Sequence, residues 1–237
     1  MLDLPLSLTV FFVITTILFY VGFLMSTLHG NERTKRRTHM IALLMMAWLI
    51  FQSTLALNRW YMDREAIPPH LFFPLITAIA FMCLALFTGR GKRFVSGMNP
   101  KTLTWLHLVR LPVEIALYWL AFFKQVPWSM TMYGHNFDIV FGITAPIMAY
   151  LVFNRKIVSM KIFQIWNALG LISLLVIVIT AIGALPNFSW WDASRPNYAV
   201  THFPFVWLPA FIVPIVMFSH LAFLLKRTGV RNLNSQH

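Results

Sequence analysis

Residues 162–184 read IFQIWNALGLISLLVIVITAIGA and contain no charged side chain. A helix that crosses a membrane needs about 20 consecutive, mostly apolar residues, and this stretch is long enough. A strand of a membrane barrel is shorter and alternates between apolar and polar residues, which this stretch does not. Because the bilayer core offers the backbone no water, such a segment must satisfy its own hydrogen bonds as a helix.

Comparable apolar segments occur along the whole chain. Together with 162–184 they predict spans at about 6–27, 39–57, 70–89, 104–123, 138–154 and 203–225. The chain is 59% hydrophobic and 11% charged, with a mean hydropathy of +0.70, whereas a soluble domain is about 25% charged. We therefore predict an all-α membrane protein, a single seven-transmembrane-helix bundle over residues 1–237, with the lipid bilayer as its partner and its oligomeric state open.

Two local features narrow this interpretation. The leader MLDLPLS has no basic residue and the apolar core after it is long, so the first segment is not expected to be a cleaved signal peptide. Cys83 is the one cysteine, which excludes an internal disulfide and a cysteine metal site.

The net charge of +12 has an ordinary membrane explanation. Fourteen of the 19 basic residues follow the first, third, fifth and seventh segments. The positive-inside rule then places the N-terminus outside and the C-terminus in the cytoplasm, in a plasma (inner) membrane crossed several times. We expect no nucleic acid as a partner, because the basic blocks are the topology signal itself.

The opposite connections are longer and rich in aromatic residues and prolines. They are residues 58–70, 124–137 and 186–202. Tryptophan and tyrosine are common interface anchors, yet loops of this size also fold over a bundle and carry functional residues. We predict that the three loops pack together at the outer side.

The fourth segment carries a polar stripe inside the membrane. His107, Arg110, Glu114 and Tyr118 are spaced by three, four and four residues, so they share one helix face. A charge at mid-bilayer costs about 2.5–3.5 kcal/mol even on the lenient scale, and such residues mark functional sites by default. Arg110 and Glu114 can pair along the helix, and we expect both to point into the bundle and to contact each other or a partner on a neighbouring helix. The alternative to a functional site is an ion pair that only fixes this helix to its neighbours.

The fifth segment begins with a polar group, His135-Asn136-Phe137-Asp138. Asn136 or Asp138 is suited to cap the helix. The functional alternative places Asp138 at the outer mouth of the bundle, opposite Glu114. The remaining polar residues of the spans are expected to form interhelical hydrogen bonds; they are Gln52, Asn58, Gln164, Asn167, Ser219 and His220.

An outer group of histidines with Asp138 suggests metal binding as a second hypothesis. His70, His135, Asp138 and His202 lie near the outer ends of three segments and have the donor types that zinc accepts. Paired histidines across helices also suit haem. No HExxH spacing or other metal-binding spacing accompanies them.

Two resemblances complete the analysis. The chain resembles a microbial rhodopsin in plan, but the seventh segment has no lysine for retinal, so no covalent retinal is expected. RLPVE (110–114), MT-x-x-G-x-NFDI (130–139) and G-x-TAP (142–146) are similar to a family of bacterial seven-helix membrane proteins without an established activity. That resemblance implies the bacterial plasma membrane and points to Arg110, Glu114, Asn136 and Asp138.

These observations predict a small-ligand receptor or small-solute transporter with an outward-facing polar pocket between the fourth, fifth and seventh helices. Arg110, Glu114, Tyr118, Asn136 and Asp138 would line it, and an unknown small molecule or ion would occupy it. The first alternative resembles ceramidase-like hydrolases, with a zinc-activated water. The second alternative is a haem-binding electron-transfer protein.

Overall fold

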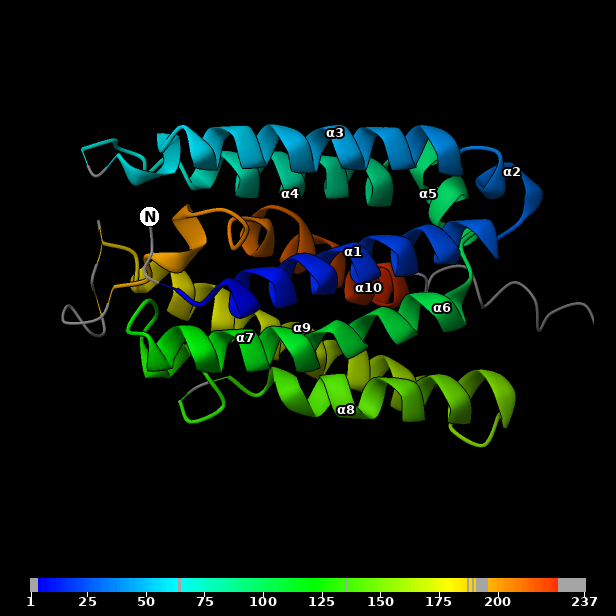
Figure 1. The fold of residues 1–237 in the computed structure, drawn as a ribbon. Coiled ribbons are helices and arrows are strands. Elements are labelled where there is room, and N and C mark those ends of the chain that lie inside the picture. Colours follow the sequence, from blue (N-terminus) through cyan, green and yellow to red (C-terminus); the bar gives the residue numbers. More distant parts are fainter. Residues whose placement is uncertain are drawn as a thin grey trace, which may run out of the picture.

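The structure, a computed structural model, describes residues 4–63, 65–134, 136–186, 188, 190 and 196–225. Within these residues the chain forms helices and turns. The longer helices are α1 (Leu6–Leu28), α3 (Thr38–Leu57), α4 (Phe72–Phe87), α6 (Pro100–Trp105), α7 (Arg110–Phe122), α8 (Asp138–Ala149), α9 (Met160–Gly183) and α10 (Val213–Leu225). They run back and forth between two ends of an elongated bundle (Figure 1).

Short helices and helical turns complete the bundle. They are α2 (Glu32–Lys35), α5 (Gly89–Ser96), four 3-10 turns (Trp60–Met62, Leu106–Val109, Trp128–Met130, Ala199–Thr201) and two π-helical turns (Tyr150–Asn154, Leu208–Ile212). Helices α2 and α5 lie at the end opposite the N-terminus (Figure 1). We call their end the basic end and the other the aromatic end.

Most of the predicted spans are present as helices. Among the described residues, five helices are long and apolar enough to cross a membrane: α1, α3, the continuous Pro100–Phe122 segment, α9 and Leu208–Leu225. Helices α4 and α5 make a sixth if they are counted together, although the chain bends by 82° between them. Residues Asp138–Asn154 form a shorter apolar helix. These helices fit a multi-pass membrane protein.

The boundaries differ from the sequence prediction at three segments. The fourth span begins at Pro100 rather than 104. The third helix ends at Phe87, and Thr88 then caps α5 through a bond from Gly91 N to its hydroxyl (3.1 Å), so the chain turns across the basic end. In the last segment, which was predicted to begin at 203, the span begins at Leu208 with a π-helical turn, and α10 follows from Val213. Pro214 has no N–H to give to Ala210 O, and that carbonyl instead accepts Trp48 Nε1 at 2.9 Å from α3.

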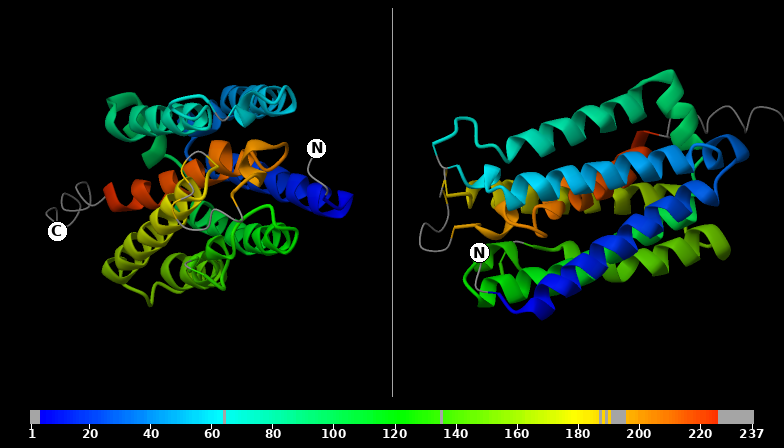
Figure 2. Two further views of the ribbon diagram at one scale, coloured as in Figure 1. Left: turned by 90° about the vertical axis from the view of Figure 1, so that its left-hand side faces the viewer. Right: turned by 45° about the horizontal axis from the view of Figure 1, so that its top comes forward.

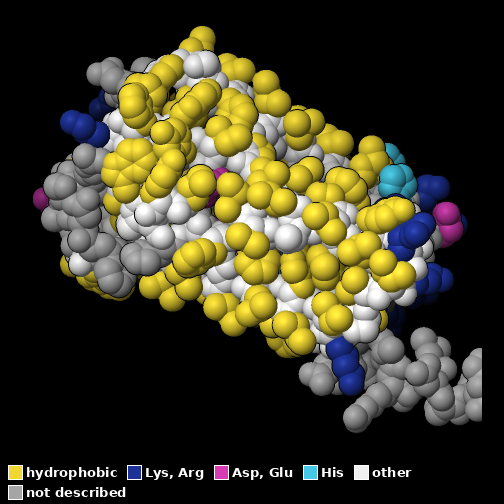
Figure 3. All heavy atoms as spheres, turned by 90° about the horizontal axis from the view of Figure 1, so that it is seen from below, with side chains coloured by type: hydrophobic (Ala, Val, Ile, Leu, Met, Phe, Trp, Pro, Cys, Tyr) yellow, Lys and Arg dark blue, Asp and Glu magenta, His cyan; other side chains and the backbone are white. Residues whose placement is uncertain are grey.

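The outer surface of the bundle suits a bilayer. Figure 3 shows hydrophobic side chains over the middle of one face, with lysine, arginine and histidine side chains gathered at the right-hand end. That end is the basic end, where α2 and α5 supply most of the arginines. Extended exposed apolar surface marks a membrane contact, and its position between polar ends gives the protein a belt of lipid-facing side chains.

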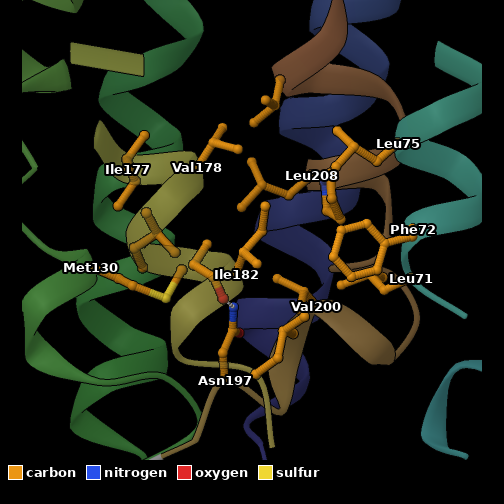
Figure 4. Close-up of a pocket in the computed structure, with 15 residues that line it drawn as sticks. Leu71, Phe72, Leu75, Met130, Ile177, Val178, Ile182, Asn197, Val200 and Leu208 are labelled. Carbon is orange, nitrogen blue, oxygen red and sulfur yellow. Dashed lines mark hydrogen bonds between the residues drawn. The ribbon is translucent and has the colours of Figure 1, made fainter. Parts of the chain in front are cut away.

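The aromatic end is closed by its loops, as far as the structure describes them. Gln125 O accepts backbone N–H groups of Tyr198 (3.0 Å) and Ala199 (3.2 Å), which joins the second loop to the third. Tyr61, in the first loop, is buried against Val206. An apolar pocket of about 70 Å³ lies beneath; in Figure 4, Leu71 and Phe72 face Ile182 and Val200 across it, and Asn197 is the one polar side chain labelled.

Candidate functional site

Arg110, the first residue of α7, is the centre of a buried polar network. Its side chain is 3% exposed and bridges three other elements. Nη1 donates to Asp138 Oδ1 of α8 at 3.1 Å, and Nη2 contacts His220 Nε2 of α10 at 2.8 Å and Gly170 O of α9 at 3.3 Å. One guanidinium thus links four helices, which suits its rigid fork of donors.

Asp138 is the ion-pair partner of Arg110. The expected contact of Arg110 with a partner on a neighbouring helix is therefore confirmed, whereas the pair with Glu114 along the helix is wrong, because the guanidinium points across to α8. Asp138 does not cap α8 through its side chain either. Its Oδ1 accepts a second bond from Ser173 Oγ at 2.6 Å, which ties α8 to α9.

Glu114 bonds to a loop rather than to a cation. Its two oxygens accept the Met132 backbone N–H and the Asn136 side-chain Nδ2, each at 2.5 Å. Asn136 Oδ1 in turn accepts the backbone N–H of Asp138 at 3.0 Å. Charge-assisted bonds of this kind are roughly twice as strong as neutral ones, so Glu114 holds the segment 130–136 down against α7.

His220 is neutral in this arrangement. Because the Arg110 guanidinium carries only donors, His220 Nε2 must accept its hydrogen bond. The ring proton is therefore on Nδ1, which donates a hydrogen bond to Asn167 Oδ1 at 2.9 Å. Asn167 Nδ2 donates to Phe163 O, which fixes the orientation of the amide. The interhelical bonds expected for Asn167 and His220 are thus confirmed.

The network continues from His220 towards the basic end through His107. The two imidazole rings stack with centroids 4.1 Å apart. His107 Nε2 pairs with Ser219 Oγ at 3.0 Å, and Ser219 Oγ donates to Leu103 O at 3.2 Å. His107 Nδ1 is fully buried and has no hydrogen-bond partner among the described residues. Polar side chains thus follow one another from Glu114 to Ser219, whose hydroxyl bonds to the backbone carbonyl of Leu103 in α6.

Two glycines allow the helices to come this close. A Cβ on Gly170 would lie 2.5 Å from His220 Cε1, and one on Gly142 would lie 3.2 Å from Arg110 Cβ. Neither Gly170 nor Ser173 was among the predicted site residues. Small residues at helix contacts were the available signal, but nothing in the sequence shows which helix faces which.

A small cavity lies beside the charged residues. It measures about 40 Å³ and is lined by Arg110, Glu114, Asn136 and Asp138, together with apolar side chains of α7, α9 and the last span. A cavity needs roughly 10–15 Å³ to hold one water molecule. This space therefore fits a few water molecules or a small ion, and an organic ligand requires the helices or the 130–136 segment to move.

Tyr118 lies apart from this network. It is 37% exposed, and its ring packs against Trp128 and Tyr133, with centroids at 5.6 and 5.9 Å. Tyr118 was expected on the same helix face as Glu114, but its side chain contacts the loop and not Arg110 or Asp138. It supports the segment that Glu114 binds.

The predicted metal ligands do not converge in the part of the chain that the structure describes. His70 Nδ1 bonds to Trp60 O at 2.7 Å and His202 Nδ1 to Tyr198 O at 2.9 Å, while Asp138 faces Arg110. His135 lies outside the described residues. No group of three or more histidine, cysteine or acidic side chains suited to a metal ion occurs among the described residues.

Comparison with known proteins adds one finding. Residues 67–226 match a domain of unknown function, DUF8737, and this is more than half of the chain. The chain belongs to the DUF8737 family. The DUF8737 region runs from before α4 to the end of α10, so it includes every residue of the polar network. No curated protein and no solved structure matches the chain.

Proposed function

We propose that this protein is a small-solute transporter, or a small-ligand receptor, of the bacterial plasma membrane. In either case, a proton or a water-sized cation bound at Arg110, Glu114 and Asp138 switches its state. The carrying observation is a charge imbalance: one guanidinium faces two carboxylates around a cavity of about 40 Å³. Burial in a medium of low dielectric favours a neutral cluster, and one bound proton or monovalent cation supplies neutrality.

The proposed topology has seven spans, with the N-terminus outside. It is supported by the alternation of the helices between the two ends (Figure 1) and by the gathering of basic side chains at one end. The segment Asp138–Asn154 is the fifth span in this scheme, and its polar start at the aromatic end shortens the apolar part. The cluster then opens towards the outside of the cell through the 130–136 segment.

The proposed mechanism begins at Glu114. As a carboxylate it accepts two N–H bonds from the 130–136 segment, and protonation removes their charge assistance. The segment is then released and the cavity gains access from the aromatic end. His220 lies on the other side of Arg110. A proton on its Nε2 would point at the guanidinium donors, so Arg110 must move before His220 can be protonated. The two protonation events therefore favour different arrangements of the network.

Accessibility of the segment tests this mechanism. In a Cys83→Ser background, Met130→Cys, at a position of the same segment that is buried in the structure, should react with a water-soluble maleimide faster at low pH, after correction for the thiol's own ionisation by Asn58→Cys, an exposed site at the same end. Adding Glu114→Gln should make the reaction fast at every pH. If the corrected rate does not change with pH while residue 114 is glutamate, the proposed release of the segment is contradicted.

An assay in vesicles distinguishes transport from sensing. The purified protein is reconstituted with a pH-sensitive dye inside and a pH gradient across the membrane, and a panel of amino acids, sugars, amines and carboxylic acids is added. Acidification that depends on one solute and is lost in Glu114→Gln identifies a proton-coupled transporter. A fluorescence response of the tryptophans without flux identifies a receptor, and flux that Glu114→Gln leaves unchanged contradicts the proposed site.

A further inference from the structure

Four arginines gather at the basic end, far from the polar network. Arg33 and Arg37, at α2 and the start of α3, line one hollow of about 350 Å³ together with Arg90 and Arg93 of α5. All four are exposed and none has an acidic partner among the described residues. The one acid nearby, Glu32, pairs with Lys35 at 3.7 Å. Like charges held this close repel one another unless an anion lies between them.

The arrangement is held by the fold. Thr34 Oγ1 donates to Phe94 O at 3.3 Å, and Asn31 N donates to Gly97 O at 2.8 Å, so α2 is bonded directly to α5. Gly97 has no room for a side chain, because a Cβ there would lie 2.2 Å from Thr34 Oγ1. The 82° bend after α4 carries α5 across the end of the bundle to this position. The four arginines therefore form a fixed group and not a loose basic tail.

An apolar groove begins where the arginines end. It measures about 590 Å³, and all of its lining residues are apolar. Phe94 lines both the groove and the arginine hollow, so the two adjoin. The groove lies between the α3–α4 pair and the helices α1 and α10, and Figure 2 shows that pair as a separate layer beside them. Along α3 its lining extends from Ile41 to Phe51.

The length of the groove matches a lipid chain. Ten residues of helix rise by about 15 Å, which is half of the roughly 30 Å hydrocarbon core of a bilayer. A charged head at the membrane surface and an apolar tail reaching the mid-plane are the two halves of one phospholipid. Basic pockets between membrane helices bind anionic head groups in this way, and arginine suits phosphate through its paired donors.

We propose that this protein binds one anionic phospholipid per chain, with the head-group phosphate among Arg33, Arg37, Arg90 and Arg93 and an acyl chain in the groove between α3–α4 and α1–α10. A zwitterionic lipid carries an ammonium group that the arginines repel, so the site selects net negative charge. The lipid fills the space between two layers of the bundle and joins them. This site does not depend on the function proposed for the polar network.

Native mass spectrometry of the purified full-length protein tests the site. The protein is taken from vesicles of equal parts phosphatidylglycerol and phosphatidylcholine, and retained lipid is counted. Wild type should keep one phosphatidylglycerol. Arg37→Gln with Arg93→Gln should lower retention by about thirtyfold, the scale expected for two lost arginine–phosphate contacts. Arg36→Gln with Lys92→Gln removes the same charge from neighbouring positions outside the hollow, and should not.

A second matched pair of variants tests the groove. Ala78 of α4 lines it and Ala80 does not, so Ala78→Trp should expel the lipid and Ala80→Trp should not, with circular dichroism confirming that both variants fold. Equal retention of the two lipids by wild type overturns the proposal, as does equal loss in both charge variants. A site that keeps its affinity in Ala78→Trp and exchanges lipid for inorganic phosphate binds a free anion, which also overturns it.

Discussion

Arg110 and Asp138 form a buried ion pair, with 3.1 Å between Nη1 and Oδ1, that joins α7 to the first residue of α8. Both side chains are at most 10% exposed. A pair of this kind gains little over a well-packed apolar contact, but removing one partner leaves a charge without compensation. The pair is therefore the point at which a single substitution affects both the stability of the bundle and the charge of the cavity.

Asp138→Asn should strongly destabilise the protein. The substitution keeps the shape but removes the ion-pair partner of Arg110, at a cost of about 3–5 kcal/mol. Glu114 still balances the net charge of the cluster, but its oxygens bond to Met132 and Asn136 of the loop. Thermal unfolding in detergent measures the effect, with the exposed Asp63→Asn as the matched control. A melting temperature as high as that of the control would show that the pair carries no net stability.

Gly170→Ala should displace the His220 ring without changing the charge of any side chain. The added Cβ would lie 2.5 Å from His220 Cε1, and overpacking of this degree costs about 1–3 kcal/mol. In a His220→Ala background the clash is absent, so the same substitution should cost clearly less. Gly89→Ala, where no atom lies within 4 Å, is the control. Equal costs in both backgrounds would mean that the crowding lies elsewhere.

His202 should make stability fall in mildly acidic solution. It lies outside the spans, and burial lowers its pKa below the ordinary value of 6.5, with a smaller opposing effect of the bond to Tyr198 O. Below about pH 6.5 the unfolded chain binds a proton that the folded protein does not. This contribution is therefore present above that pH and is lost as the pH falls towards the folded pKa. His202→Gln should flatten the dependence of the unfolding free energy on pH over this range; an unchanged slope would contradict it.

Reporter fusions test the topology. A reporter that is active only outside the cytoplasm should give a signal when it is inserted in the loop after Lys124 and none when it is fused to the C-terminus. The reason is the concentration of basic side chains at the end where α2 and α5 lie. An active C-terminal fusion would reverse the orientation and place the arginine hollow outside.

The sequence predicts much of the fold because apolar length alone carries the information. The spans at 6–27, 39–57 and 162–184 differ from α1, α3 and α9 by no more than two residues at either end. Prediction fails where the chain leaves the regular pattern. The bend after Phe87 depends on Thr88 capping a polar helix, and the late start of the last helix depends on prolines and a partner tryptophan.

The sequence predicted four members of the site, Arg110, Glu114, Asn136 and Asp138, but not how they pair. Residues three or four apart on one helix are the only neighbours that a sequence shows, which favoured Glu114 as the partner of Arg110. The true partners, Asp138 and His220, are 28 and 110 positions away. Asn58 was also mispredicted, since it bonds to Thr54 O of its own helix at 2.8 Å. Which helices adjoin is decided by small residues such as Gly170, whose role appears only in three dimensions.

Infrared difference spectroscopy tests the central claim, that the cluster of one guanidinium and two carboxylates takes up one cation. In sodium-free buffer, wild type should show the carbonyl band of a buried protonated carboxyl. Glu114→Gln should lose the band, because it replaces a carboxyl group of the cluster by an amide. Asp138→Asn should lose it because the excess negative charge is gone, and Asp63→Asn should keep it. A wild-type spectrum without this band, or a band that survives both Glu114→Gln and Asp138→Asn, would contradict the account.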